Sequence, residues 1–256
     1  MATECVQALS PSRRWPQMTF FPGRFFRQTV ADPRRLDLWI GLPPSARPSV
    51  AWMEPPLPDD DTPVVRQMLA SQATPEAQQA MTAGEALPFP AENGIVTMND
   101  PVLQAAELPG INGIGTARSL ARLYAACVGD LDGVPRLLTA DSVADASVPR
   151  SWGQMVLGDP DRGQRWGTGF MLSSSPARPM LSEQSFGHDG AGGQLGFADP
   201  AHRVGFAYLS RQMGPLLDER ANVLVRALGR CLGVPEPSRT PAAPSPSRST
   251  PEGIHE

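Results

Sequence analysis

Residues 185–200 read SFGHDGAGGQLGFADP and carry the most informative local pattern in the chain. The pattern predicts a strand that ends at His188-Asp189-Gly190, a glycine-rich connection, and a second strand that ends at Asp199-Pro200. Glycines within or beside strands mark places where another group approaches the backbone closely. A strand edge with exposed N–H groups beside a histidine is a place where a carbonyl oxygen can bind. The residues alone also fit a glycine-rich hairpin with a solvent-exposed histidine, so both interpretations stay open at this point.

The residues around this stretch predict an antiparallel sheet covered by a helix. Short apolar runs between turn residues predict strands at Trp166–Leu172, Gln184–His188, Gly193–Asp199 and Arg203–Ser210. The last three suit a meander packed under an amphipathic helix from about Leu216 to Leu232. The side chains of this helix that are predicted to face inward are Leu217, Ala221, Leu224, Val225, Leu228 and Cys231.

The part of the chain before the sheet is predicted to be mainly helical from residue 62 to 147. The predicted helices run from Thr62 to Ser71, from Thr74 to Met81, from Thr116 to the stop at Gly129, and from Thr139 to Ala146. A short helical turn is predicted at 25–30, and residues 82–115 read as loops because they contain several glycine, proline and asparagine turn signals.

The chain divides by composition into three parts. Residues 1–24 are predicted to be a separate N-terminal segment without a clear period, residues 25–234 a folded domain, and residues 235–256 a tail rich in Pro and Ser. The tail has almost no apolar residue and cannot offset the entropy of ordering, so it is predicted to be disordered.

Composition excludes several classes of partner. The net charge is −4 with no basic run, which argues against nucleic acid and anionic membranes. The three cysteines are far apart without metal-ligand spacing, and Cys127 and Cys231 are predicted to be buried thiols. No metal or cofactor is predicted. Without an apolar span or the order of a secretory signal, the expectation is a soluble cytoplasmic protein.

Five ordered blocks resemble the serine β-lactamase-like family, which includes class C β-lactamases, D-alanyl-D-alanine carboxypeptidases and related esterases. The blocks are LDLWIGLP (36–43), GINGIGTARSLARLYAA (110–126), WGTGF (166–170), FGHDGAGGQLGFADP (186–200) and VGFAYLSRQMG (204–214). The resemblance covers roughly residues 25–42 and 110–233. It implies an α/β (α+β) fold of the β-lactamase/transpeptidase type, an antiparallel sheet flanked by helices, with the N-terminal half incomplete.

The resemblance also implies site residues. The family uses a Ser-x-x-Lys helix, a Tyr-x-Asn or Ser-Asp-Asn loop and a Lys-Thr-Gly strand. Here His188-Asp189-Gly190 stands where Lys-Thr-Gly stands in the best-known members. His188 would take the cationic or hydrogen-bonding role that faces the cleft, and the backbone N–H of Ala191 would bind the oxyanion. Gly190 would let the substrate lie against the strand.

The departures from the family concern the nucleophile. All 22 basic residues are arginine, so these 256 residues cannot contain Ser-x-x-Lys. The only tyrosines, Tyr124 and Tyr208, have no asparagine two residues further on. No Gly-x-Ser-x-Gly elbow is present either.

Other candidate side chains around the histidine do not complete a catalytic set. Ser185, three residues before His188 on the same predicted strand, would point to the opposite face, and Asp189 also points away from the histidine. His202 is predicted to be a surface residue and His255 lies in the tail, so a metal site built from the three histidines is rejected.

Two functions follow. One is a serine hydrolase that acts on a small-molecule ester, β-lactam or D-Ala-D-Ala-type amide; the other is an inactive fragment or pseudoenzyme that only binds a ligand or another chain. Histidine in place of lysine favours esterase-like chemistry, because a histidine is mostly neutral at pH 7 and pairs weakly with a substrate carboxylate. The missing N-terminal half leads us to expect self-association or pairing with a complementary half.

Overall fold

The computed structural model describes residues 21–54, 57–59, 61–82, 98–154, 163–173 and 178–235. The predictions for residues 1–20 and for the tail from residue 236 onward therefore lie outside the described residues, and the three-part division of the chain stays a prediction. Among the described helices, none is long and apolar enough to cross a membrane.

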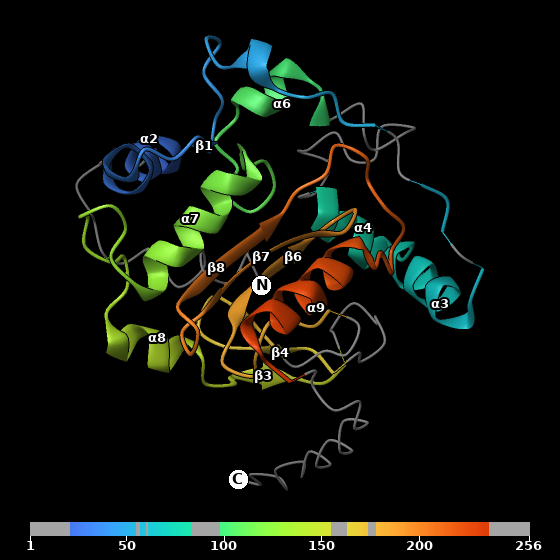
Figure 1. Ribbon diagram of the computed structural model, residues 1–256. Helices are drawn as coiled ribbons and strands as arrows, with labels where there is room; N and C mark the ends of the chain where they lie inside the picture. The colour runs from blue at the N-terminus through green and yellow to red at the C-terminus, as the bar shows by residue number, and fades with distance from the viewer. Residues whose placement is uncertain are drawn as a thin grey trace, which may run out of the picture.

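The centre of the fold is a six-stranded antiparallel sheet with the strand order β3-β4-β5-β6-β7-β8 (Figure 1). The strands are β3 Ser151–Trp152, β4 Arg165–Trp166, β5 Met171–Leu172, β6 Phe186–Gly190, β7 Gln194–Asp199 and β8 Val204–Tyr208. The predicted meander between residues 184 and 210 is confirmed. The run 166–172 was predicted as one strand but forms the hairpin β4–β5, because Gly169 adopts a φ of +81° between them.

Two helices cover the two faces of this sheet, as the predicted fold class requires (Figure 1). On one face Leu195 and Phe197 pack in a buried cluster with Ala221 and Val225 of α9, Arg220–Leu232. Gly196 lies between these two residues and so faces the other side, where it meets helix α7, Ala117–Val128. The result is a helix–sheet–helix arrangement with the core on both faces of β7.

Helix α7 packs closely on the sheet because glycines face it. A Cβ at Gly205 of β8 would lie 2.1 Å from the carbonyl oxygen of Ala121. The helix begins where the sequence predicts, since the hydroxyl of Thr116 accepts a hydrogen bond from the N–H of Ser119 at 3.1 Å. Helix and strand backbones therefore touch almost directly.

The prediction for α9 was partly wrong. The helix starts at Arg220 rather than near Leu216, and two side chains predicted to face inward are exposed, Leu224 at 45% and Cys231. The buried stripe instead runs through Ala221, Asn222, Val225 and Gly229, because the helix rests on the sheet through its small residues. The prediction that Cys231 is buried is therefore wrong, while the prediction for Cys127 is confirmed.

The predicted helical region is largely confirmed. Helices α3 Pro63–Gln72, α4 Pro75–Thr82 and α8 Ala140–Ala146 follow capping threonines at residues 62, 74 and 139. The predicted turn at 25–30 is helix α2, Pro22–Phe26, continued by a π-helical turn, Arg27–Ala31, and a 3-10 turn, Asp32–Arg34. A further 3-10 turn spans Arg47–Ser49.

Three short elements were not predicted. Helix α6, Pro101–Ala105, lies in the stretch that was read as loops and is capped by Asp100. Strands β1, Leu38–Trp39, and β2, Ile114–Gly115, pair as a separate two-stranded sheet. Each element is too short to leave a periodic pattern in the sequence.

Candidate active site

The third-motif residues lie at the end of β6 where one edge of the strand is open. Strand β5 pairs with β6 only at Phe186 and Gly187. On the opposite edge β7 continues through His188↔Gly196, Asp189↔Leu195 and Gly190↔Gln194. Among the described strands, His188–Gly190 therefore has no ladder partner on its β5 side. Such a segment offers backbone groups to an extended ligand.

The ring of His188 sits at this open edge. Its side chain is 56% exposed, and the ring lies beside the indole of Trp166 with centroids 5.2 Å apart. The Nδ1 atom contacts the carbonyl oxygen of Asp189. A carbonyl only accepts hydrogen bonds, so Nδ1 carries the proton in the neutral ring and Nε2 is the unprotonated nitrogen. His188 thus presents a base or hydrogen-bond acceptor at the edge.

Asp189 does not orient this histidine by a hydrogen bond. Its Oδ1 lies 3.7 Å from His188 Nδ1, beyond hydrogen-bond range, and its Oδ2 lies 3.7 Å from Nε of the buried Arg178. The Asp189 carboxylate therefore stays near the imidazole without a hydrogen bond to it, although successive side chains leave a strand on opposite faces. Its partner Arg178 was not singled out in the sequence, where it stands in a loop without any motif.

Gly190 and Ala191 begin the turn between β6 and β7. Ala191 is exposed at the turn, and Gly192 and Gly193 follow with φ of +76° and +89°. The N–H of Gly193 donates to the carbonyl of Gly190 at 3.2 Å. No acceptor for the N–H of Ala191 is found among the described residues. Within the described residues, this exposed amide is therefore left without a hydrogen bond.

Three buried or half-buried groups that could act as nucleophiles, Ser185, Tyr124 and Cys127, are not activated in the described structure. Ser185 is buried and donates to Asp199 Oδ2 at 2.7 Å, on the far side of the strand as predicted. Burial, and then the charge of Cys127, raise the pKa of Tyr124. Burial raises the pKa of the Cys127 thiol to about 11, against the opposite effect of two nearby arginines. Neither group would ionise near pH 7.

His202 is exposed at the surface, as the sequence predicts, and it also contacts a buried carboxylate. Its ring is 33% exposed, and its Nδ1 lies 2.9 Å from Oδ1 of Asp199. Burial acts to raise the pKa of Asp199, but hydrogen bonds from Ser182, Ser185 and His202 outweigh it and lower the pKa. At the end of β7, Asp199 forms hydrogen bonds with Ser182, Ser185 and His202. His202 is therefore part of this cluster and not of the edge of β6.

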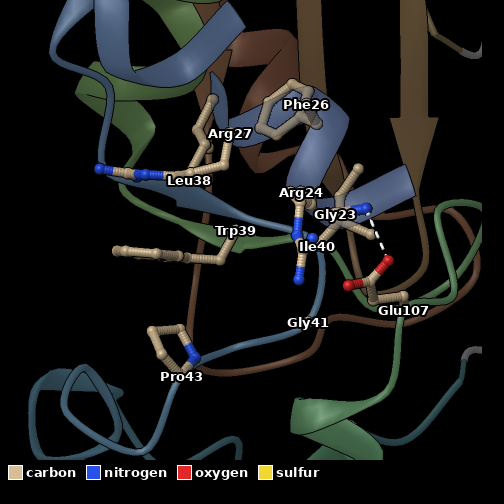
Figure 2. Close-up of a pocket in the computed structure, with 10 residues that line it drawn as sticks. All are labelled: Gly23, Arg24, Phe26, Arg27, Leu38, Trp39, Ile40, Gly41, Pro43 and Glu107. Atoms are coloured by element: carbon tan, nitrogen blue, oxygen red, sulfur yellow. Dashed lines mark hydrogen bonds between the residues drawn. The ribbon is translucent and has the colours of Figure 1, made fainter. Parts of the chain in front are cut away.

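A cavity lies elsewhere in the described part of the chain, between α2 and β1 (Figure 2). It holds about 200 Å³ and is lined by Gly23, Arg24, Phe26, Arg27, Leu38, Trp39, Ile40, Gly41, Pro43 and Glu107. Its charged groups are already engaged: Glu107 accepts the Gly23 N–H at 2.8 Å, and the Arg27 guanidinium lies 3.9 Å from the centre of the Trp39 ring. No third-motif residue lines it, so it is not part of the candidate site.

Comparison with known proteins shows which family the chain resembles. The family model described as Beta-lactamase matches residues 22–230. The chain is 32% identical over 197 residues to the esterase/beta-lactamase LipL of Mycobacterium tuberculosis, covering 75% of this chain and 43% of LipL.

Solved structures show the same relationship. The chain is similar to EstA from Arthrobacter nitroguajacolicus, with a TM-score of 0.65, 27% identity and coverage of 82% of this chain and 54% of EstA. It is also similar to a family VIII carboxylesterase, with a TM-score of 0.62, 31% identity and coverage of 82% and 51%. A penicillin-binding protein homologue from Caulobacter crescentus gives a TM-score of 0.59, 30% identity and coverage of 79% and 50%.

The chain therefore spans about half the length of these relatives. The match of the family model extends over most of the 256 residues, and it includes α7, the whole six-stranded sheet and nearly all of α9. Because this match covers well over half of the chain, the chain belongs to the Beta-lactamase family.

Proposed function

We propose that this chain forms one side of the active site of a serine ester hydrolase, namely the strand that carries the third motif. His188 stands at the position of the family's lysine, and the N–H of Ala191 serves as an oxyanion donor. The observation that carries the proposal is the open edge of β6, where an exposed imidazole and an unpaired backbone amide lie within four residues of one another. An ester carbonyl that approaches this edge would meet both groups.

Esters fit this edge better than β-lactams. A β-lactam carries a carboxylate that a permanent cation would hold, and the edge presents an imidazole instead of an ammonium. Arg178, a nearby cation, is buried and faces Asp189 rather than the open edge. Among the relatives, LipL is named an esterase/beta-lactamase and one solved structure is a carboxylesterase, which supports the same choice.

The nucleophile would come from a separate polypeptide segment. These 256 residues contain no lysine and therefore no Ser-x-x-Lys, and Ser185 is buried against Asp199. We propose that hydrolysis requires a complementary half that bears Ser-x-x-Lys and Tyr-x-Asn. The alternative function is a module that binds a ligand or partner without chemistry, and the open edge of β6 would serve that as well.

Complementation tests the proposal. We expect the chain, mixed with a separately expressed segment bearing Ser-x-x-Lys and Tyr-x-Asn, to hydrolyse p-nitrophenyl esters faster than either part alone. His188→Ala should lower kcat of the mixture by about 10²-fold or more, because an acid–base or electrostatic group is lost. His255→Ala is the matched control. A complex that forms without hydrolysis would favour the binding module, and activity insensitive to His188→Ala would exclude the assigned role.

Strand β8 is the edge at which we propose that the complementary half, or a second copy, adds. Within the described residues β8 pairs only with β7, and all five of its residues are half-buried. Unpaired strand edges promote association. We expect size-exclusion chromatography of the chain alone to show oligomers or aggregates, and thermal melting to be broad. A monomer that melts sharply would contradict this proposal.

A further inference from the structure

We infer that Asp218 and Arg220 position the turn that presents Ala191. The inference rests on the proposed function for the task of the Ala191 N–H, whereas the contacts that support it do not depend on that function. Both residues lie at the start of α9, more than twenty residues beyond the turn. Neither belongs to the motif that defines the candidate site.

Arg220 joins the turn to the segment that follows β8. Its Nη2 donates to the carbonyl oxygens of Gly192 at 3.2 Å and Gln212 at 2.9 Å. Its Nη1 lies 3.4 Å from the Ser210 hydroxyl. The N–H of Gly214 also donates to the Gly192 carbonyl, at 3.0 Å. The carbonyl that follows Ala191 is therefore held by two donors.

Asp218 fixes the guanidinium that makes these contacts. Its carboxylate accepts from Arg220 Nε at 2.8 Å and from Arg220 Nη2 at 2.5 Å, and its side chain is only 3% exposed. Burial acts to raise the pKa of Asp218, but the hydrogen bonds and charge of Arg220 outweigh it and lower the pKa. The pair stays ionised and rigid, as charge-assisted bidentate pairs do.

Two glycines make room for this carboxylate. A Cβ at Gly193 would lie 2.0 Å from Asp218 Oδ2, and a Cβ at Gly214 would lie 1.9 Å from the same atom. The glycines of the turn and of the segment after β8 thus serve one purpose, which is close packing around Asp218. Any larger residue at either position would displace it.

The other side of the turn reaches Asp218 as well. Asp189 faces Arg178, and Arg178 Nη1 donates to the backbone carbonyl of Asp218 at 2.9 Å and to Asn222 Oδ1 at 3.2 Å. Ala191 lies two residues after Asp189 and one residue before Gly192, and both Asp189 and Gly192 are connected through arginines to Asp218. The direction of the Ala191 N–H is therefore set from α9.

Asp218→Asn compared with Glu219→Gln tests the inference. The two variants make the same chemical change at adjacent positions, but the side chain of Glu219 is 61% exposed and pairs with Arg226 at 3.5 Å. We expect hydrogen exchange, followed by mass spectrometry, to speed up by about tenfold or more in peptides covering 188–194 and 210–216 of Asp218→Asn. Peptides of α7 should change far less, and Glu219→Gln should match the parent chain.

Arg220→Lys is the second variant, used also if Asp218→Asn does not fold. Lysine keeps the charge but loses the planar fork, so we expect it to give the same local acceleration. Acceleration by one common factor in all peptides would show a role in global stability only and would overturn the inference, as would no change in the turn peptides. Hydrolysis is not measured, so failure here is distinct from failure of the complementation test.

Discussion

Purified alone, the chain is expected to hydrolyse nitrocefin and p-nitrophenyl esters no faster than its His188→Ala variant. An oxyanion donor without a nucleophile leaves little catalysis: in serine hydrolases, removal of the nucleophile lowers kcat by roughly 10⁶-fold. The described edge of β6 has an amide donor and an imidazole, while Ser185 is held by Asp199. Chromogenic assays over a range of enzyme concentrations measure the difference.

The His188→Ala variant is the appropriate background because it removes an exposed side chain. The imidazole is more than half exposed, so its loss should not change folding. Ester turnover that is proportional to protein concentration and disappears in the variant would show that this chain contains its own nucleophile. The proposed need for a complementary half would then be wrong.

Gly205→Val is expected to reduce the free energy of unfolding by at least about 3 kcal/mol, or to prevent accumulation of folded protein. The Cβ of any residue at 205 would lie 2.1 Å from the carbonyl oxygen of Ala121 and 2.3 Å from the nitrogen of Ala125. Both atoms belong to the backbone of α7, so no side chain can move to relieve the contact. Helix and β8 would have to separate.

Gly113→Val is the matched control for this experiment. A Cβ at Gly113 meets nothing within 4 Å, so the same substitution there should change the unfolding free energy by less than about 1 kcal/mol. Urea denaturation followed by circular dichroism gives both values. Equal effects of the two substitutions would show that the close contact between α7 and β8 does not stabilise the fold.

Sequence patterns predicted the parts of the fold whose signals are local. The strands from Phe186 to Tyr208 alternate with glycine and Asp-Pro turns, and Thr116 and Thr139 cap their helices as expected. It was harder to predict which side chains of α9 face the sheet. The buried face of a helix depends on the element that packs against it. Leu224 fits an amphipathic pattern but is exposed, since Ala221 and Val225 make the contact with the sheet.

In the candidate site, too, residues within a local motif could be predicted and residues joined by long-range contacts could not. Roles for His188 and Ala191 could be predicted because both residues belong to a contiguous motif that resembles the family's third motif. Arg178, Asp218 and Arg220 could not, because Arg178 bonds to Asp218 across 40 positions and Arg220 bonds to Gly192 of the turn across 28, which leaves no local pattern. The bond between His202 and Asp199 spans only three residues, but burial of the carboxylate, which gives the bond its importance, is a property of the sheet.

The central proposal is that this chain contributes the β6 side of a serine hydrolase active site, with His188 and Ala191, and does not contribute the nucleophile. Incubation with a fluorophosphonate probe, followed by intact-mass and peptide analysis, tests it most directly, because such probes label only an activated serine. We expect no adduct on the chain alone, and an adduct only on the Ser-x-x-Lys segment when the two are mixed. Stoichiometric labelling of one serine of the chain alone, blocked by His188→Ala, would contradict the claim.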